Sequence, residues 1–202
     1  RLKKVELKKF LNIKNKIQNK YLKSNINDNN LSFVYEISKN FQIKDNEFIK
    51  YIKSFKGLEH RHEVFYKKKN YQFINDSKAT SFASTKKALL SNRNIYWILG
   101  GLPKVKDKIT LSNTKRNIKK AYIIGKNINF FKNQIKGKIK YSISSNLKKA
   151  IIQVLKDIRD KNYQLTVLFS PSSASYDQYK NFVERGNEFK KLVKYYVKKK
   201  IK

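Results

Sequence analysis

The chain has 202 residues, of which 40% are hydrophobic, and this predicts one medium-sized domain or one domain with a flanking piece. It has no cysteine, which excludes disulfides, cysteine-ligated metals and thiol catalysis. There is no run of eighteen apolar residues, so a transmembrane helix is not expected. The basic start, Arg1–Lys4, lacks the apolar stretch of a secretory signal, and we expect a cytoplasmic protein.

The net charge of +34 raises the question of a nucleic-acid partner. Lysine provides 42 of the 48 basic residues and is spread along the whole chain, whereas arginine, which makes forked contacts to phosphate and guanine, is scarce. Abundant Lys, Asn, Ile, Phe and Tyr are what an AT-rich genome encodes, so genome bias is favoured as the source of the charge. A basic nucleic-acid-binding module stays open as an alternative, supported by lysines between aromatic residues in the segment 66–71.

The first part of the chain reads as helical. Residues 1–24 are Lys-rich and fit either a strand or a helix remnant. Apolar spacing predicts a helix over 27–41, capped by Asn27 or Asp28, and a second over 45–55 with Asp45 as its N-cap. Gly57 interrupts the helical spacing, and the pattern of apolar and polar residues changes between residues 53 and 58. We therefore predict two domains, 1–54 and 55–202.

After Gly57, short apolar strands alternate with amphipathic segments, which is typical of a mostly parallel sheet covered by helices. The predicted fold class is α/β, a Rossmann-like sheet with flanking helices. Strands are predicted over 63–66, 71–75, 95–99, 121–124 and 165–169, with a weaker candidate at 139–142. Helices are predicted over 81–91, 126–133, 145–160 and 175–197.

Polar clusters follow three of these strands, in the position where open α/β sheets bind ligands. They are the segments 76–80, 100–104 and 170–175, which bring together an acid, lysines, hydroxyls and paired glycines. One such loop alone is typical of helix capping. Three at successive strand ends favour a site for a carboxylate or phosphate. His60 and His62 have no obvious third ligand, so a structural role is favoured over a metal site.

Four motifs follow one another along the chain: Phe55–Glu63 (FKGLEHRHE), Asn75–Thr80 (NDSKAT), Gly100-Gly101-x-x-Lys104, and Ser170–Phe189 (SPSSASYDQYKNFVERGNEF). Their order and spacing resemble those of the Mur ligases, ATP-dependent amide-forming enzymes of bacterial cell-wall synthesis. The resemblance runs from about Ser24 to Val197. The last motif favours the branch that adds D-glutamate over its siblings and over folylpolyglutamate synthase-type ligases, which share the architecture and stay an alternative.

The resemblance implies a reaction in which ATP phosphorylates the carboxylate of UDP-N-acetylmuramoyl-L-alanine and the amine of D-glutamate displaces the phosphate. The cofactors implied are ATP and Mg²⁺, and the protein is expected to be a monomer. It implies nucleotide contacts for Asn27, Arg61 and Asp76. It implies a D-glutamate pocket built from Lys78, Thr80, Lys104, Ser175, Tyr176 (through its backbone amide) and Phe182.

The chain departs from the family at several points. It contains no Gly-x-x-Gly-Lys-Ser/Thr loop, the element that holds ATP phosphates, and no UDP-binding domain. The lysine that the family carbamylates to support magnesium is also missing. Ile26 precedes Asn27 where the family has histidine, and Ser81 stands where it often has asparagine. Together with the absence of methionine, this predicts a C-terminal fragment that begins with the helical end of the central ATPase domain. We expect no catalytic or metal-ligating residue in the fragment, and no activity from it alone.

Overall fold

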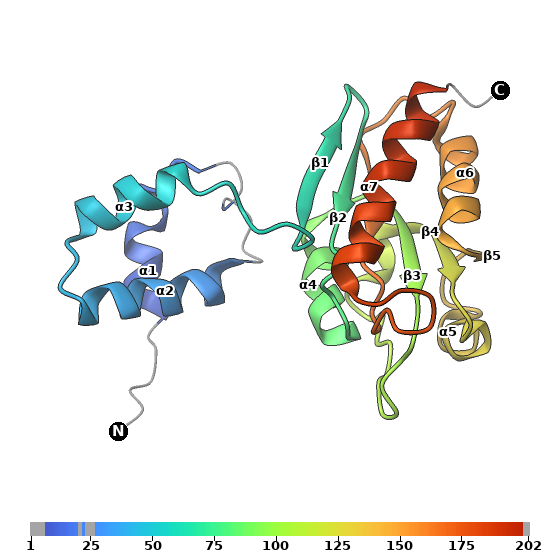
Figure 1. Ribbon diagram of the computed structural model, residues 1–202, viewed down its shortest axis with the longest axis horizontal. Helices are drawn as coiled ribbons and strands as arrows, with labels where there is room; N and C mark the ends of the chain where they lie inside the picture. The colour runs from blue at the N-terminus through green and yellow to red at the C-terminus, as the bar shows by residue number, and fades with distance from the viewer. Residues whose placement is uncertain (1–6, 20–21, 23–26, 200–202) are drawn as a thin grey trace. The chain divides into compact units, whose positions relative to one another are not determined.

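The computed structural model describes residues 7–19, 22 and 27–199. The chain forms two compact units, Arg1–Gly57 and Leu58–Lys202, and each is described by itself (Figure 1). The division lies at Gly57, whose φ of +83° falls in the left-handed region that favours glycine.

Unit 1 is helical. The described part of the predicted remnant 1–24 contains helix α1 (Leu7–Lys14), and α2 (Asp28–Asn40) and α3 (Asp45–Ser54) follow. Apolar side chains from all three helices meet in one small core, where Tyr35 packs edge-to-face on Phe48 with ring centroids 5.1 Å apart. The core consists of Phe10, Ile13, Ile17, Leu22, Leu31, Tyr35 and Phe48.

The predicted N-cap of α3 is wrong. Lys44 is the capping residue, and its backbone N–H donates to the Glu47 carboxylate at 3.2 Å. Asp45 instead accepts a hydrogen bond from the Tyr35 hydroxyl at 2.8 Å and pairs with Lys39. These partners on α2 hold the Asp45 carboxylate away from the helix end. Asn27 does stand at the N-cap of α2, but its side chain makes no capping hydrogen bond.

Unit 2 contains one six-stranded sheet in the order β1-β2-β6-β3-β4-β5. β1 pairs antiparallel with β2, and the other neighbours pair parallel. β3 is buried at all six positions, as expected for the centre of a sheet covered on both faces. The strands are β1 (Glu63–Lys67), β2 (Tyr71–Asn75), β3 (Ile95–Gly100), β4 (Ile118–Ile124), β5 (Tyr141–Ser145) and β6 (Leu165–Phe169).

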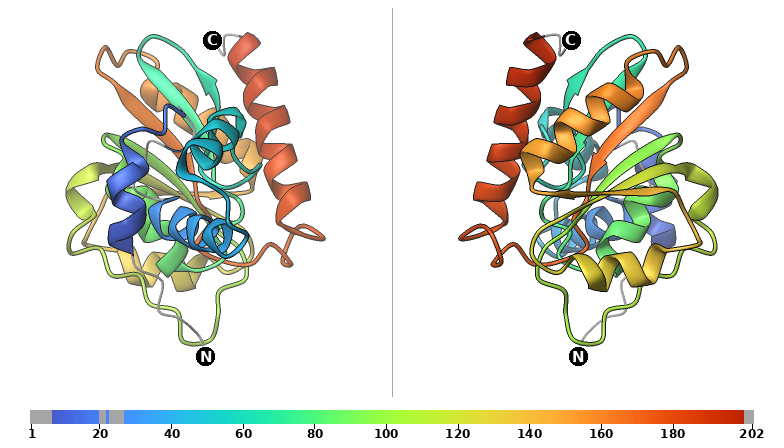
Figure 2. Two further views of the ribbon diagram at one scale, coloured as in Figure 1. Left: turned by 90° about the vertical axis from the view of Figure 1, so that its left-hand side faces the viewer. Right: turned by 90° about the vertical axis from the view of Figure 1, so that its right-hand side faces the viewer.

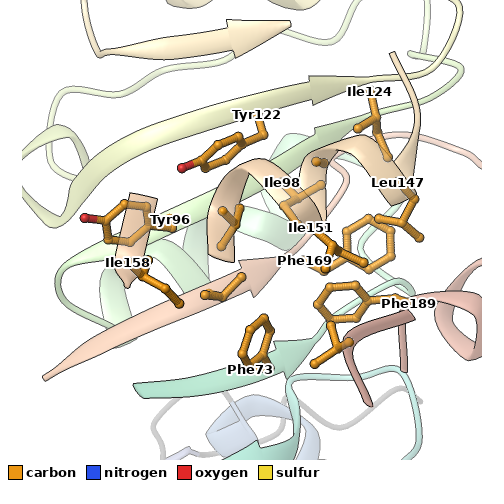
Figure 3. Packing of buried hydrophobic residues seen from close by; sticks show 14 of the residues in the cluster. Phe73, Tyr96, Ile98, Tyr122, Ile124, Leu147, Ile151, Ile158, Phe169 and Phe189 are labelled. Atoms are coloured by element: carbon orange, nitrogen blue, oxygen red, sulfur yellow. The ribbon is translucent and has the colours of Figure 1, made fainter. Parts of the chain in front are cut away.

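Helices cover both faces of this sheet. α6 and α7 pack against each other over one face, and their core includes Phe169 and Phe189, whose ring centroids are 4.6 Å apart (Figures 1 and 3). Trp97 points to the other face, where it contacts Phe82 of α4. The helices are α4 (Phe82–Ser91), α5 (Ile128–Ile135), α6 (Leu147–Ile158) and α7 (Phe182–Lys198), with a 3₁₀ turn at Lys115–Asn117.

The predicted fold class is confirmed, with corrections at element ends. The helix predicted from Ser175 begins only at Phe182, because Asn181 caps it by accepting from the Glu184 backbone N–H at 2.9 Å. The weak strand 139–142 is real but shifted to 141–145, and β4 begins three residues earlier than predicted.

The β1–β2 turn and the end of α7 lie at one end of the unit. The loop after β3 and the segment before α7 lie at the other (Figures 1 and 2).

Candidate active-site loops

The three polar loops predicted from the sequence follow β2, β6 and β3, which are adjacent in the sheet. Backbone hydrogen bonds tie each loop to its neighbour: Asp76 N donates to Phe169 O at 2.8 Å, and Gly100 N donates to Pro171 O at 3.0 Å. Residues far apart in sequence therefore share one edge of the sheet, the edge at which open α/β sheets bind ligands.

Asp76 sits at the base of this edge and is 5% exposed. One carboxylate oxygen, Oδ1, accepts from the backbone N–H of His62 at 3.0 Å, and Oδ2 accepts from the Ser170 hydroxyl at 2.7 Å. Burial raises the pKa of Asp76 to about 7, although both hydrogen bonds and the charge of Arg61 favour its ionised form. Asp76 is thus a carboxylate whose protonation state is sensitive to small changes around it.

Arg61 lies just before β1 and is half-buried. Its Nε atom is buried and has no hydrogen-bond partner within the described ranges. A buried donor without a partner costs free energy, so this atom fits a site completed by an acceptor from outside the chain. The guanidinium charge is close enough to Asp76 to lower the pKa of that carboxyl.

His60 and His62 point at two different amides. His60 Nδ1 lies 2.9 Å from Asn75 Nδ2, and His62 Nε2 lies 2.9 Å from Asn92 Nδ2. The amide nitrogens are donors, so each of these ring nitrogens accepts. Burial lowers the pKa of His62 to about 4 and also lowers the pKa of His60. These neutral imidazoles fix the loop before β1 rather than converge on a common point.

Sequence reasoning assigned no role to Arg185, which the structure makes central. Its side chain is 1% exposed, and it donates from Nη2 to Ser77 O at 2.9 Å and to Ser173 O at 3.0 Å. The same guanidinium lies over the Phe169 ring, 5.9 Å from its centroid. Arg185 therefore clamps the loop after β2 to the loop after β6. The signal in the sequence was an arginine inside an apolar helical stripe of a chain that otherwise uses lysine.

Gly101 brings the third loop into this arrangement. Its φ is +137°, and a Cβ there would lie 2.4 Å from Ala174 O and 3.1 Å from Arg185 Nη1. Only glycine permits this approach. Next to it, Leu102 and Ala174 form a two-way backbone bridge at 2.9 and 3.0 Å, which joins the loops after β3 and β6.

The residues expected to hold D-glutamate are distributed over these loops. Lys78 is exposed, and its Nζ lies 5.4 Å from the centroid of the half-buried Phe182 ring. Thr80 is half-buried two residues further along. The Ser77 hydroxyl donates to Phe182 O at 2.8 Å, which fixes the start of α7 beside the loop after β2. Lys78 and Phe182 are thereby brought together.

The remaining expected residues flank the Leu102–Ala174 bridge. Lys104 is exposed two residues beyond Leu102, Ser175 is buried directly after Ala174, and Tyr176 is 71% exposed. Asn27 belongs to unit 1 and is described only within that unit.

A cavity of about 780 Å³ lies elsewhere, between the loop after β3 and α5. It contains none of the residues singled out from the sequence, so its size alone does not mark the site. Its lining includes Ile109, Leu111, Phe130 and Lys138.

Within residues 7–19, 22 and 27–199, no three His, Cys, Asp or Glu side chains cluster as metal ligands would. Across the same ranges no helix is long and apolar enough to span a membrane.

Comparison with known proteins places these loops in context. Over 163 residues, 81% of the chain, the sequence is 39% identical to the UDP-N-acetylmuramoylalanine–D-glutamate ligase of Wolbachia pipientis wMel. The resemblance to the Mur ligases is confirmed. The enzymes of the same name from Rickettsia conorii and Rhizobium meliloti are 35% and 40% identical over 86% and 73% of the chain. The chain spans only about a third of the length of these Mur ligases, 32 to 35%. No family model matches the chain.

A solved structure supports the fold. The MurF ligase of Thermotoga maritima, in complex with ADP, superposes with a TM-score of 0.54 at 13% identity, covering 85% of the chain and 38% of the MurF chain. At this identity the likeness concerns the fold alone. The fold of the chain is thus similar to that of part of the MurF ligase.

Proposed function

We propose that this chain is the C-terminal part of an ATP-dependent ligase that adds D-glutamate to UDP-N-acetylmuramoyl-L-alanine in the cytoplasm. The observation that carries the proposal is the convergence of three motif loops, after β2, β6 and β3, at one sheet edge in a chain similar to D-glutamate ligases. In this proposal residues 1–54 are the end of the central ATP-binding domain, and the complete enzyme acts as a monomer.

The proposed reaction makes an amide bond in two steps. A carboxylate oxygen of the muramoyl-alanine substrate attacks the γ-phosphorus of ATP, which forms an acyl phosphate and releases ADP. The amine nitrogen of D-glutamate then attacks the acyl carbon, the C–O bond to phosphate breaks, and phosphate leaves after the nitrogen loses a proton. Such chemistry depends on cations and oriented donors near the developing negative charge.

Residues of this chain would supply part of that environment. Arg61 would donate its buried, unpartnered Nε–H to a nucleotide phosphate, with Asp76 beside it. Lys78 and Lys104 would face the two carboxylates of D-glutamate. Thr80, Ser175 and the Tyr176 backbone amide would donate hydrogen bonds, and Phe182 would close the pocket beside Lys78.

The residues described for this chain offer no complete magnesium site of their own. Asp76 uses both oxygens in hydrogen bonds, and the described ranges offer no cluster of three acidic, His or Cys side chains. Mg²⁺ would therefore be held with ATP by other parts of the enzyme. For the same reason, and because the sequence has no phosphate-binding Gly-x-x-Gly-Lys-Ser/Thr loop, the 202 residues alone would be inactive.

A chimera tests the proposal. In the Wolbachia pipientis relative, the segment that aligns with this chain is replaced by this chain. Phosphate release is then measured with ATP, UDP-N-acetylmuramoyl-L-alanine and D-glutamate. We expect release that requires D-glutamate and is lost with Arg61→Ala, while the isolated 202-residue chain releases none. A chimera that ignored D-glutamate and used L-lysine or diaminopimelate equally well would contradict the proposal.

A further inference from the structure

A row of four buried side chains runs from Ser172, in the loop after β6, through Thr85 of helix α4 and Ser170 to Asp76. The Ser172 hydroxyl lies 3.0 Å from Thr85 Oγ1, Thr85 Oγ1 lies 2.8 Å from Ser170 Oγ, and Ser170 Oγ lies 2.7 Å from Asp76 Oδ2. Thr85 and Ser170 are 0% exposed and Ser172 is 2% exposed, so water does not compete for these bonds. We call these three hydroxyl residues and Asp76 the hydroxyl row.

Counting protons gives the hydroxyl row a direction. An ionised carboxylate cannot donate, so the single Ser170 proton goes to Asp76. Ser170 can then only accept from Thr85, and Thr85, having used its own proton, can only accept from Ser172. With Asp76 ionised, every bond therefore points toward the carboxylate, an arrangement in which each hydrogen bond polarises the next.

Two backbone features hold the members of the hydroxyl row in place. Ser172 has a φ of +62°, a left-handed conformation that non-glycine residues adopt only when their surroundings require it. Thr85 is held in α4 by its backbone N–H, which donates to Ser81 O at 3.2 Å. The row thus connects α4, and the loop after β2 that leads into it, with the loop after β6, which lies about 90 positions further along the chain.

We propose that Thr85 is a positioning residue, which holds the Ser170 hydroxyl so that it donates to Asp76 and keeps that carboxylate ionised and oriented beside Arg61. The sequence motifs singled out Asp76 but gave Thr85 no role. The inference rests on the proposed function in one respect, the contact of Asp76 and Arg61 with the nucleotide. Thr85 itself touches no reacting atom.

The environment of Asp76 supports this role. The groups that act on its titration are the Ser170 hydroxyl, the backbone N–H of His62 and the charge of Arg61, all of which favour the ionised form against burial. The His62 imidazole is neutral above a pKa of about 4. Because the pKa of Asp76 is already about 7, loss of one favourable bond leaves more of the protonated form at neutral pH.

The first test needs no ligase activity. The pKa of Asp76 is measured from the carbon-13 shift of its carboxyl carbon in the 202-residue chain. Thr85→Val, which keeps the side-chain shape but removes the hydroxyl, should raise this pKa by about half a unit to one unit. Thr85→Ser should restore it. Ser173→Ala is the matched control, because the Ser173 hydroxyl is buried nearby but donates to Pro171 O outside the row.

The second test uses the chimera described above. Thr85→Val should raise the KM for ATP about threefold to tenfold and leave the KM for D-glutamate unchanged, with the acid limb of the pH profile moved upward. Ser172→Ala, which breaks the row at its far end, repeats the test should Thr85→Val fail to fold. An unchanged Asp76 pKa in both folded variants would overturn the inference. If the Asp76 pKa rises in the variants of the 202-residue chain but the unaltered chimera has no ligase activity, the inference about the hydroxyl row stands and the proposed function is rejected.

Discussion

The Arg185 guanidinium contacts Ser77 twice, from Nε to the hydroxyl oxygen at 3.1 Å and from Nη2 to the carbonyl oxygen at 2.9 Å. The two residues are 108 positions apart, and both are buried. This double contact sets the distance between the start of α7 and the loop after β2. Much of the geometry of the candidate site therefore depends on one cation inside the protein.

Replacing Arg185 by methionine should lower the free energy of unfolding by about 3 kcal/mol, because carbonyl oxygens of Ser77 and Ser173 lose their donor while buried. Urea unfolding of the 202-residue chain measures this. Arg93→Met, at an exposed position, is the control and should change stability by less than about 0.5 kcal/mol. Equal effects of the two substitutions would show that the clamp contributes no stability.

Gly101→Ala should destabilise the chain by more than about 3 kcal/mol, since its Cβ would lie 2.4 Å from Ala174 O at a φ of +137°. Gly137→Ala is the matched control, because φ there is +73° but nothing lies within 4 Å of the added Cβ. Backbone conformation alone should cost this control about 1 kcal/mol. The two melting temperatures distinguish steric exclusion from conformational strain, and similar losses would mean that the loops after β3 and β6 separate readily.

Asp76 should make stability fall as the pH rises. Its folded pKa of about 7 lies above the ordinary value of 3.8, so between these pH values the folded state binds a proton that the unfolded state has lost. The proton on Asp76 stabilises the folded state by at most about 4 kcal/mol at low pH, and this stabilisation is fully lost above about pH 7. His62 acts in the opposite sense between its folded pKa of about 4 and its ordinary 6.5. The measurement is therefore the difference between the unaltered chain and Asp76→Asn across pH 4 to 8. A difference that does not vary with pH would contradict the raised pKa.

Lys104→Ala in the chimera should raise the KM for D-glutamate about tenfold to hundredfold with little change in the KM for ATP, because a charge-assisted hydrogen bond to a carboxylate is lost. Lys106→Ala, two residues along the same exposed loop, is the control and should change neither constant. Steady-state kinetics with each substrate varied in turn provides both values. Equal losses for both substrates would indicate a folding role for Lys104.

Local patterns of apolar spacing and turn residues were enough to predict helices α2 and α3, the strand–helix alternation and the three polar loops. The start of α7 could not be predicted in this way, since the segment 175–181 is amphipathic enough for a helix. It is held as turns by the Leu102–Ala174 bridge and the Asn181 cap. The prediction that Asp45 caps α3 was wrong for a similar reason, because the Asp45 carboxylate contacts α2.

By itself the sequence determined the fold class, the resemblance to Mur ligases and the positions of Asp76, Lys78 and Lys104 after strands. Only the tertiary structure decided that β6 lies between β2 and β3, and so which loops meet. It also decided that Arg185 is a clamp and that Asp76 ends a row of hydroxyls. The physical reason is that burial and hydrogen bonding between residues about 90 to 110 positions apart depend on how the sheet is ordered, which local patterns do not encode.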